Sequence, residues 1–346
     1  MDGDMVQNNE RVTIFDVAET AGVSISTVSR VMNGNYPVKQ ELRDRVNKAV
    51  AELGYTPDSV ARGMKFKRRY AIGYVVSDIT NRHFTIISKT IDDILGPLGY
   101  SLIVCSTDSN QEKEARAIKM LLSNRVDGLI INTSGKNDEY IASISKTLPV
   151  VLLHRRIASS EFSGDYIGSD NYQACAHLAR HAFTMGHRDI GIITSDQSIS
   201  TFRERTIGFV ETLADLGAPV LPSRIIATPY TEEGGYKAIG TLLESHPELS
   251  LVMIMNNATT IGAIQYIREH GIAVPDSLSL LSFGEMLNAN LMYFKPTYMT
   301  QKPLLVGKEV AAIMLDRLED PTHAGREVVI EAQFEQGESV KDFSKQ

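Results

Sequence analysis

Three patterns of apolar and polar positions follow one another along the chain. Residues 11–57 carry short amphipathic stretches, which predict a compact unit of three helices over 14–21, 24–33 and 39–53. In the third stretch the apolar residues recur at helical spacing, so one face of that helix would pack on the other two. Residues 58–69, "DSVARGMKFKRR", are short and basic, and they predict a linker with weak helical character.

From about Tyr70 the pattern changes to apolar strands separated by amphipathic helices. Short apolar runs that alternate with helices are typical of parallel sheets covered by helices on both faces. The runs are too numerous for one sheet of ordinary size, so we expect an α/β fold with two doubly wound lobes that divide near residue 165. The predicted strands are "AIGYVV", "SLIVCS", "DGLIIN", "PVVLLH", "DIGIIT", "RIIAT", "SLVMIM" and "LSLLSF".

The composition fits this division and adds one asymmetry. A chain of 346 residues with 43% hydrophobic and 22% charged residues is typical of a soluble protein with two or three domains. The net charge is −7, but residues 1–69 carry +2 and the remainder carries −9. A locally basic segment on an acidic body suits contact with DNA.

Several classes of function find no support in the sequence. The N-terminus lacks the apolar region of a secretory signal, no run of ~18 apolar residues predicts a membrane span, and Cys105 and Cys175 are expected to be buried thiols in a reducing cytoplasm. There is no phosphate-binding "GxxxxGKS/T" motif, no metal-spaced His/Cys cluster and no "GxSxG" motif. We therefore expect a cytoplasmic protein that is not an enzyme and needs no cofactor or metal.

The stretch "GVSISTVSRVMNG" suggests what the first unit contacts. Two short helices joined by a tight turn at Gly22 and braced by a third form a helix-turn-helix, whose second helix enters the DNA major groove. Short hydroxyls suit phosphate oxygens and the long Arg30 suits base edges, whereas Val28, Val31 and Met32 would pack inward. A small helical bundle with a polar, solvated face is the alternative on spacing alone. The hydroxyl residues are Ser24, Ser26, Thr27 and Ser29.

This region resembles the N-terminal domain of the LacI–GalR family of bacterial transcription regulators. The family pattern "TIxDVAxxAGVSxxTVSRVxNG" matches from Thr13 without a gap, and the resemblance continues through "IGYVVSDITNRHF", "RVDGLIINT", "GHRDIGIIT" and "VPDSLSLLSFGE". It implies a headpiece, a hinge helix and a two-lobed core similar to periplasmic sugar-binding proteins. The expected parts are a headpiece over 11–57, a hinge over 58–69, an N-terminal lobe over 70–165 plus about 300–325, and a C-terminal lobe over 166–299 plus about 326–346.

The resemblance implies roles for individual headpiece and hinge residues. Ile25 and Ser26 correspond to the operator-discriminating pair, and Ile25 can meet a thymine methyl group. The hinge reads "VARGM" where family members carry "VARxL", so Met64 replaces the leucine that wedges into the minor groove, and Gly63 costs up to about 1 kcal/mol in a helix. The expected DNA-binding set is Thr13, Ser24, Ile25, Ser26, Thr27, Ser29, Arg30, Asn33, Val60, Ala61, Arg62, Met64 and Lys65.

The resemblance also places a small effector between the lobes, at the carboxyl ends of the strands. The usual "NPFF" is "NRHF" here, the aspartate of "VVLIDR" is His154, and the aspartate after Phe283 is Gly284. Fewer carboxylates and more cations favour an anionic effector, a sugar acid or sugar phosphate, because guanidinium groups bind such anions in a bidentate fork. The expected effector-binding set is Asn81, Arg82, His83, Phe84, His154, Arg155, Arg203, Arg205, Asn256, Glu285 and Lys302.

The expected protein is a homodimer that binds double-stranded operator DNA with two-fold symmetry, most simply a repressor of a carbohydrate-use operon. A solute receptor with the same two-lobed fold is an alternative, which the headpiece argues against. A regulator with a protein corepressor is another. The sequence does not say whether the effector releases DNA or promotes DNA binding.

Overall fold

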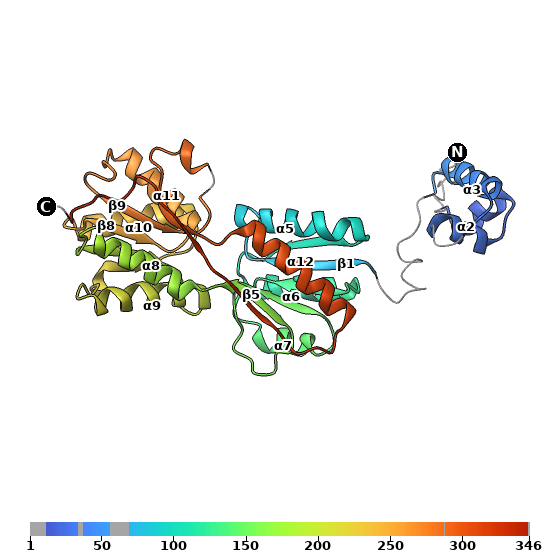
Figure 1. Cartoon of the computed structure of the whole chain (residues 1–346), viewed down its shortest axis with the longest axis horizontal. Coiled ribbons are helices and arrows are strands. Elements are labelled where there is room, and N and C mark those ends of the chain that lie inside the picture. Colours follow the sequence, from blue (N-terminus) through green and yellow to red (C-terminus); the bar gives the residue numbers. More distant parts are fainter. Residues whose placement is uncertain (1–11, 34–36, 56–68, 287, 345–346) are drawn as a thin grey trace, which may run out of the picture. The chain divides into compact units, whose positions relative to one another are not determined.

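The computed structural model describes residues 12–33, 37–55, 69–286 and 288–344. The chain divides into two compact units, Met1–Arg69 and Tyr70–Gln346. Each unit is described by itself below, with element labels as in Figure 1.

The first unit holds the three predicted helices, α1 (Ile14–Ala21), α2 (Ile25–Asn33) and α3 (Gln40–Leu53). Gly22 ends α1 with a φ of 61°, a left-handed conformation that glycine adopts without steric cost. The Arg45 guanidinium on α3 donates to the Gly22 carbonyl at 2.9 Å, so the tight turn is tied to the third helix.

A small apolar core joins the three helices. Val28 of α2 is fully buried, and Val31 and Met32 are half-buried against it, as the inward-facing prediction required. The other buried members of the core are Val17, Ala18, Ala21, Val46 and Ala49.

The second unit holds two six-stranded sheets. In the first sheet the strands follow the order β11-β5-β4-β3-β1-β2 and all pairs are parallel. Its strands are β1 (Ala71–Val76), β2 (Ser101–Ser106), β3 (Gly128–Ile131), β4 (Val150–Leu153), β5 (Asp165–Ser169) and β11 (Glu327–Ile330).

The second sheet follows the order β12-β10-β9-β8-β6-β7, and it is parallel except for the edge strand β12. Its strands are β6 (Ile190–Thr194), β7 (Ile225–Ala227), β8 (Leu251–Ile254), β9 (Ser279–Phe283), β10 (Thr297–Thr300) and β12 (Gln333–Glu335). The expected fold class, a helical headpiece plus two parallel-sheet lobes, is confirmed.

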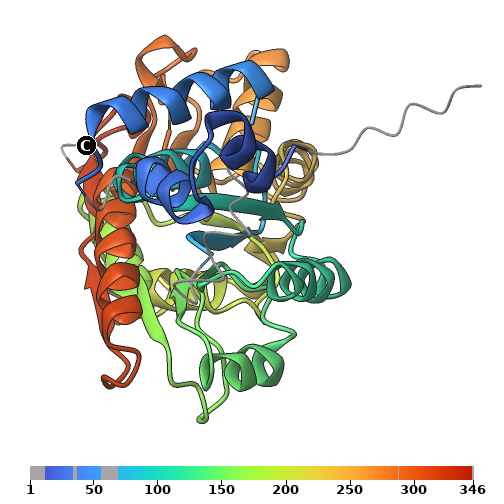
Figure 2. The same ribbon diagram turned by 90° about the vertical axis from the view of Figure 1, so that its right-hand side faces the viewer.

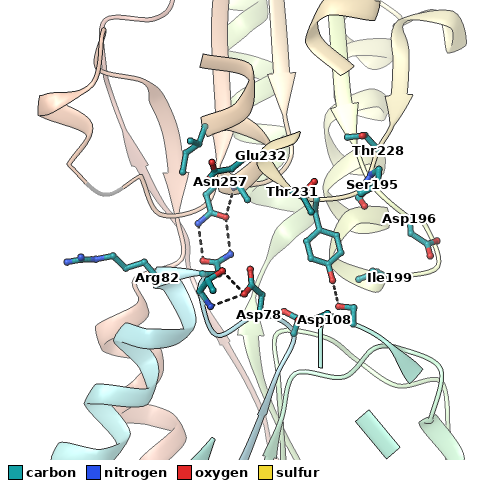
Figure 3. A pocket seen from close by; sticks show the side chains of 18 of the residues that line it. Asp78, Arg82, Asp108, Ser195, Asp196, Ile199, Thr228, Thr231, Glu232 and Asn257 are labelled. Carbon is teal, nitrogen blue, oxygen red and sulfur yellow. Dashed lines mark hydrogen bonds between the residues drawn. The ribbon is translucent and has the colours of Figure 1, made fainter. Parts of the chain in front are cut away.

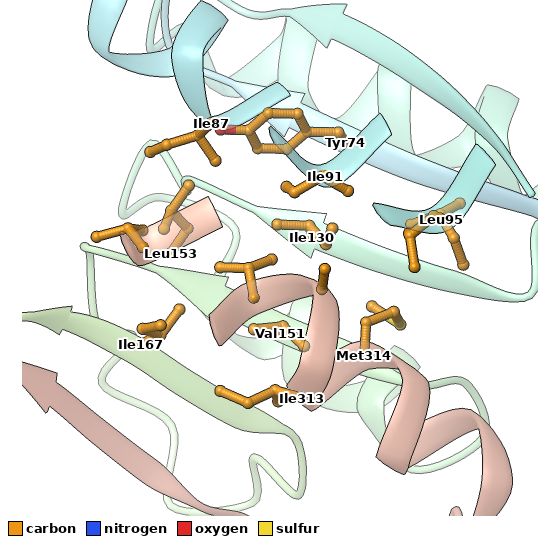
Figure 4. Close-up of a cluster of buried hydrophobic side chains, with 14 of the residues drawn as sticks. Tyr74, Ile87, Ile91, Leu95, Ile130, Val151, Leu153, Ile167, Ile313 and Met314 are labelled. Carbon is orange, nitrogen blue, oxygen red and sulfur yellow. The ribbon is translucent and has the colours of Figure 1, made fainter. Parts of the chain in front are cut away.

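Helices cover both faces of each sheet. On the first sheet, α5 (Arg82–Leu95) and α12 (Pro303–Glu319) share one apolar core, which Figure 4 shows, and α6 (Gln111–Ser123) and α7 (Asp138–Ser145) pack on the other face. On the second sheet the pairs are α8 (Asn171–Thr184) with α9 (Ser200–Asp215), and α10 (Glu232–Ser245) with α11 (Asn257–Glu269). Short 3-10 turns are η1 (Gly96–Leu98), η2 (Pro222–Arg224) and η3 (Ala289–Leu291). No helix in the described part of the chain is long and apolar enough to cross a membrane.

The chain crosses between the lobes three times, and two crossings differ from the expected boundaries. The expected division near residue 165 falls at the start of β5, which pairs with β4, so the first lobe continues to Ser169. The segment expected to leave the first lobe near 325 also adds β11 beside β5, where it is drawn in red beside green in Figure 2. Asp165 and Glu327 are the first residues of these two strands. An acidic first residue shortens the apolar run from which a strand is predicted.

Candidate functional site

The exposed face of α2 carries the residues expected to meet DNA. The Ser24 hydroxyl lies 2.8 Å from the Ser26 hydroxyl and 2.9 Å from the Thr27 hydroxyl, and it accepts the Thr27 backbone N–H at 3.3 Å. Ser24 therefore caps the helix, as serine often does. Ile25 is 40% exposed, and Ser26 and Arg30 are also exposed.

Some of the remaining expected DNA-binding residues lie in the described part of the chain, and the others lie outside it. Thr13 is engaged within the chain, because its backbone N–H and its hydroxyl both donate to the Asp16 carboxylate at 2.7 Å. Ser29 is half-buried on α2. The side chain of Asn33 and the hinge residues Val60, Ala61, Arg62, Met64 and Lys65 lie outside the described residues.

The second unit is hollow where the carboxyl ends of its two sheets meet. A cavity of about 1010 Å³ opens there, and a pocket of about 60 Å³ lies beside it. We call them the outer cavity and the inner pocket; Figure 3 shows the outer cavity. Residues that line both are Ser77, Asp78, Asn81, Tyr230, Asn257 and Glu285, so the two spaces form one cleft.

Two histidines form one wall of the inner pocket. The Nε2 atoms of His83 and His154 lie 2.7 Å apart, and the two side chains are only 5% and 4% exposed. Burial, with the nearby positive charge of Arg205, lowers the pKa of His83 to about 3. Burial, with His83, Arg205 and Arg155, holds the pKa of His154 well below its ordinary value.

Two buried guanidinium groups face the same pocket. Arg205 donates through Nε to Asn171 at 2.9 Å and through Nη1 to the Met255 carbonyl at 2.9 Å, and it lies 3.8 Å from the centre of the Phe283 ring. Arg155 donates to the Ser109 hydroxyl at 2.9 Å and to a backbone carbonyl at 2.8 Å. Burial lowers the pKa of Arg205 to about 10 and lowers that of Arg155.

These two guanidinium groups have neutral partners. Among the described residues, neither Arg155 nor Arg205 has a hydrogen bond to a carboxylate; the charges of Glu114 and Glu204 act on them from farther away. Each is 6% exposed, so little water hydrates the two guanidinium groups. The inner pocket therefore presents positive charge that an anion would stabilise.

The outer cavity has the opposite character. Five of its side chains are acidic, and Lys136 and Arg82 are its basic members. The Arg82 side chain extends away from Asp78 and Asn257 (Figure 3). The cleft is thus basic at its inner end and acidic at its wide end; the acidic residues are Asp78, Asp108, Asp196, Glu232 and Glu285.

Direct hydrogen bonds join the two lobes across the cleft. The amides of Asn81 and Asn257 pair reciprocally, with N–O distances of 3.2 and 3.1 Å (Figure 3). The Tyr230 hydroxyl also donates to Ser109. Asn81 and Ser109 belong to the first lobe and their partners to the second, so both contacts join the lobes directly.

The structure gathers most of the expected effector-binding residues in the cleft. Asn81, Arg82, His83, Phe84, His154, Arg155, Arg205, Asn256 and Glu285 all line one or both spaces. Asn256 also caps α11, since its side chain accepts the Ala258 N–H at 2.8 Å.

Two expected residues lie elsewhere. Arg203 is exposed and donates to the backbone carbonyls of Gln197 and Ser198. It lies two positions before Arg205 on α9, so the two side chains point to different faces of the helix. Lys302 precedes α12 with a φ of 50° and lines neither the outer cavity nor the inner pocket. Its neighbour Gln301, which is 6% exposed, lines the inner pocket instead.

Sequence reasoning missed residues that follow the strands more directly. Asp78, Ser109 and Tyr230 come shortly after β1, β2 and β7, and their position at strand ends is a signal that could have found them. Glu114 gave no such signal, because an acid in the first turn of α6 is typical of a solvated helix start. It is fully buried and accepts the Ser134 N–H at 2.5 Å, which holds the loop after β3 against the cleft.

Gly284 explains why one departure from the sugar-binding pattern affects the backbone as well as the charge. Its φ is 109°, a conformation that residues with a side chain rarely adopt. A Cβ atom there would lie 3.2 Å from the Asn257 side chain. This position therefore suits glycine in this chain.

Comparison with known proteins gives two matching family models. Residues 13–58 match the model described as bacterial regulatory proteins, lacI family, and residues 69–338 match periplasmic binding proteins and sugar binding domain of LacI family. Together they cover the headpiece and nearly all of the two-lobed unit.

Individual relatives agree with these models. The catabolite control protein A of Priestia megaterium is 32% identical over 278 residues, which are 79% of this chain and 82% of that protein. The HTH-type transcriptional repressor PurR of Serratia proteamaculans (strain 568) is 30% identical over 335 residues, 95% of this chain and 97% of that protein. A crystal structure of the lac repressor dimer bound to operator and the anti-inducer ONPF shares the fold, with a TM-score of 0.82 at 23% identity over 96% of this chain and 100% of that one.

Proposed function

Because the chain belongs to the LacI family of bacterial regulatory proteins, we propose that an anionic small molecule, a sugar acid or a sugar phosphate, controls its activity from the cleft between the lobes. The chain is a DNA-binding transcriptional repressor controlled by a small effector, and it is not an enzyme. The proposal concerns the chemistry of that effector, the DNA contacts and the assembly.

The observation that carries the anion proposal is the pair of buried guanidinium groups without carboxylate partners, Arg155 and Arg205. Hydrogen bonds to a charged group contribute about 1.5–3 kcal/mol each, and guanidinium groups bind carboxylates and phosphates with good geometry. Asn132 and Gln301 add polar capacity, because Asn132 Oδ1 and Gln301 Nε2 are buried without a hydrogen-bond partner beside the same pocket.

The shape of the cleft supports an effector with two different ends. The inner pocket of about 60 Å³ is much smaller than the outer cavity of about 1010 Å³, so the acid group of the effector is assigned to the inner pocket. The ring would lie in the outer cavity, where carboxylates such as Asp78, Asp196 and Glu232 accept hydrogen bonds from hydroxyl groups. A sugar with an acid or phosphate group at one end meets both conditions.

For DNA binding, we propose that a homodimer places two copies of α2 in successive major grooves of a pseudo-palindromic operator. Ile25, Ser26 and Arg30 are exposed on α2 and are our proposed base contacts. Ser24 and Thr27, whose hydroxyls form a cluster at the start of the helix, are placed to approach phosphates. A cytoplasmic location follows from this function.

The test is a fluorescence-anisotropy titration of a palindromic operator from the protein's own promoter region, at fixed salt. The panel contains D-glucose, D-gluconate, D-glucuronate and D-glucose 6-phosphate. A shift of operator affinity by an acid or phosphate and not by D-glucose supports the anion proposal and gives the sign of control. Tight operator binding that only neutral sugars change would overturn the anion proposal, and operator binding that no small molecule changes would favour a protein corepressor.

A further inference from the structure

The backbone around the His83–His154 pair holds the two imidazole rings against each other. His83 lies in the first turn of α5, and His154 directly follows β4 in the left-handed conformation, with a φ of 62°. A left-handed φ in a non-glycine residue costs about 1–2 kcal/mol and needs support from its surroundings. That support comes from the His154 N–H, which donates to the Ile167 carbonyl at 2.7 Å, and from the Tyr166 hydroxyl, which donates to the His154 carbonyl at 3.1 Å.

The 2.7 Å separation of the two Nε2 atoms limits how the two rings can be protonated. Two neutral imidazoles at this distance share one proton, with one Nε2–H donating to the other Nε2 lone pair. One ring then carries its hydrogen on Nδ1, and the other Nδ1 is an unprotonated acceptor. Both Nδ1 atoms are buried without a hydrogen-bond partner, so the pair has an unused site for one more proton.

Burial and the neighbouring positive charges disfavour the addition of one more proton to the histidine pair. Burial is the main cause that lowers both pKa values; the charge of Arg205 adds to it at both histidines, and Arg155 adds to it at His154. The other titratable side chains around the inner pocket are Asp78, Tyr230 and Glu285, of which the two acids are half-exposed at its wide side. An anion in the inner pocket would offset the two guanidinium charges and favour a protonated pair.

We propose that the acid group of the effector binds together with one proton, which the His83–His154 pair takes up, and that this pair distinguishes an acid from a neutral sugar. The inference rests on the anionic effector of the proposed function. By linkage, a proton that promotes anion binding makes anion affinity depend on pH. Affinity should be constant at high pH and should tighten by up to about tenfold per pH unit below the pKa that the pair has in the complex.

Isothermal titration calorimetry of the full chain with D-gluconate, between about pH 5 and 8, tests this directly. The carboxylate of D-gluconate stays ionised over that range, so any pH dependence of affinity belongs to the protein. Repeating the titration in two buffers of different ionisation enthalpy counts the protons taken up, and the expected number approaches one per chain at the acidic end.

Variants separate the histidine pair from general effects of pH. His83→Gln and His154→Gln keep hydrogen-bonding capacity without a titrating ring, and they should remove both the proton uptake and the pH dependence of D-gluconate affinity. His177→Gln, an exposed position on α8 outside the cleft, should change neither. Binding of D-gluconate with constant affinity and no proton uptake in the wild-type protein would overturn this inference and leave the anionic effector standing. Failure of D-gluconate, D-glucuronate and D-glucose 6-phosphate to bind at any pH would overturn both.

Discussion

At the scale of single residues, the cleft separates two arginines that look equivalent in the sequence. Arg203 and Arg205 are two positions apart on α9, but Arg205 is 6% exposed in the inner pocket and Arg203 is exposed. Their different environments follow from the helical repeat, which turns the chain by about 200° over two residues. The pair therefore offers a matched comparison of a buried and an exposed guanidinium.

We expect Arg205→Met to weaken D-gluconate binding by about 10- to 100-fold, because it removes charge-assisted hydrogen bonds worth about 1.5–3 kcal/mol. Methionine retains an apolar stem over the Phe283 ring. Arg203→Met should leave the affinity within about twofold, since Arg203 is exposed and donates to the backbone carbonyls of Gln197 and Ser198 outside the inner pocket. Calorimetric titration measures both, and equal binding by wild type and Arg205→Met would argue against a role for this guanidinium in anion binding.

Residue identities predicted much of the candidate site, but only where a motif placed them. His83, His154 and Arg205 were found because they replace or match residues at recognisable positions. Glu114 and Gln301 were not, because their roles depend on tertiary burial that a sequence pattern does not report. Lys302 lines neither the outer cavity nor the inner pocket, whereas its neighbour Gln301 lines the inner pocket.

At the scale of elements, α12 is tied to β5 by a buried ion pair. Arg317 donates to both carboxylate oxygens of Asp165 at 2.9 and 2.8 Å, and the two residues are 4% and 0% exposed. The backbone N–H of Arg326 adds a third hydrogen bond to Asp165. This explains how a strand that begins with an aspartate lies inside a parallel sheet, and why its apolar pattern was too short to predict it.

Arg317→Met should lower the free energy of unfolding by about 3–5 kcal/mol, because it leaves the Asp165 carboxylate buried without its main partner. Although burial raises the pKa of Asp165, Arg317 and Arg326 outweigh it and hold that pKa below its ordinary value. In the wild type, the stability from this pair is therefore complete above the ordinary aspartate pKa and is lost as pH falls through the lower folded-state pKa.

In Arg317→Met the pKa of Asp165 should rise, because burial then opposes the charged form with only Arg326 left to favour it, and protonation of Asp165 should cost less stability than in the wild type. The difference in the free energy of unfolding between the wild type and Arg317→Met should therefore become smaller as pH falls. Urea unfolding curves at a series of pH values measure it. A difference that stays constant with pH would mean that the loss comes from packing and not from the charge of Asp165.

The α2 helix carries its own prediction. Arg30→Ala should weaken binding to the native operator by about 1–3 kcal/mol and reduce discrimination against altered base pairs, because a base-reading side chain is lost. Lys48→Ala on α3, whose ion pair with Glu52 is exposed, should change operator affinity much less. Anisotropy titrations with native and altered operators compare the two, and equal loss on all sequences would assign Arg30 to the phosphates.

At the scale of the whole two-lobed unit, two hydrogen-bonded contacts join opposite walls of the cleft. The reciprocal amide pair of Asn81 and Asn257 and the Tyr230–Ser109 hydrogen bond join residues that are far apart in the sequence. Apolar periodicity predicted the sheets on either side, but it says nothing of such polar contacts, which form only once both lobes are folded. The cleft as a space was therefore predictable, and the bonds across it were not.

A double-mutant cycle of Asn81→Ala and Asn257→Ala should show coupling in the free energy of unfolding, of about 0.5–1.5 kcal/mol for each of the two hydrogen bonds. The matched control combines Asn257→Ala with Asn124→Ala at the end of α6. In this control the two changes in the free energy of unfolding should add. Urea unfolding of the single and double variants measures both cycles. Additivity in the first cycle would show that the amide pair contributes nothing to joining the lobes.

The three crossings of the chain between the lobes also determine when each lobe can be completed during protein synthesis. The first lobe needs α12 and β11, which lie after Pro303, to cover its sheet and complete its edge. Until those segments leave the ribosome, the apolar face of α5 that carries Ile87 and Ile91 has no partner in Ile313 and Met314. The second lobe has five of its six strands by residue 300. The lobe that is translated first therefore waits longest for its last segments, and a nascent chain exposes its apolar surface for most of its synthesis.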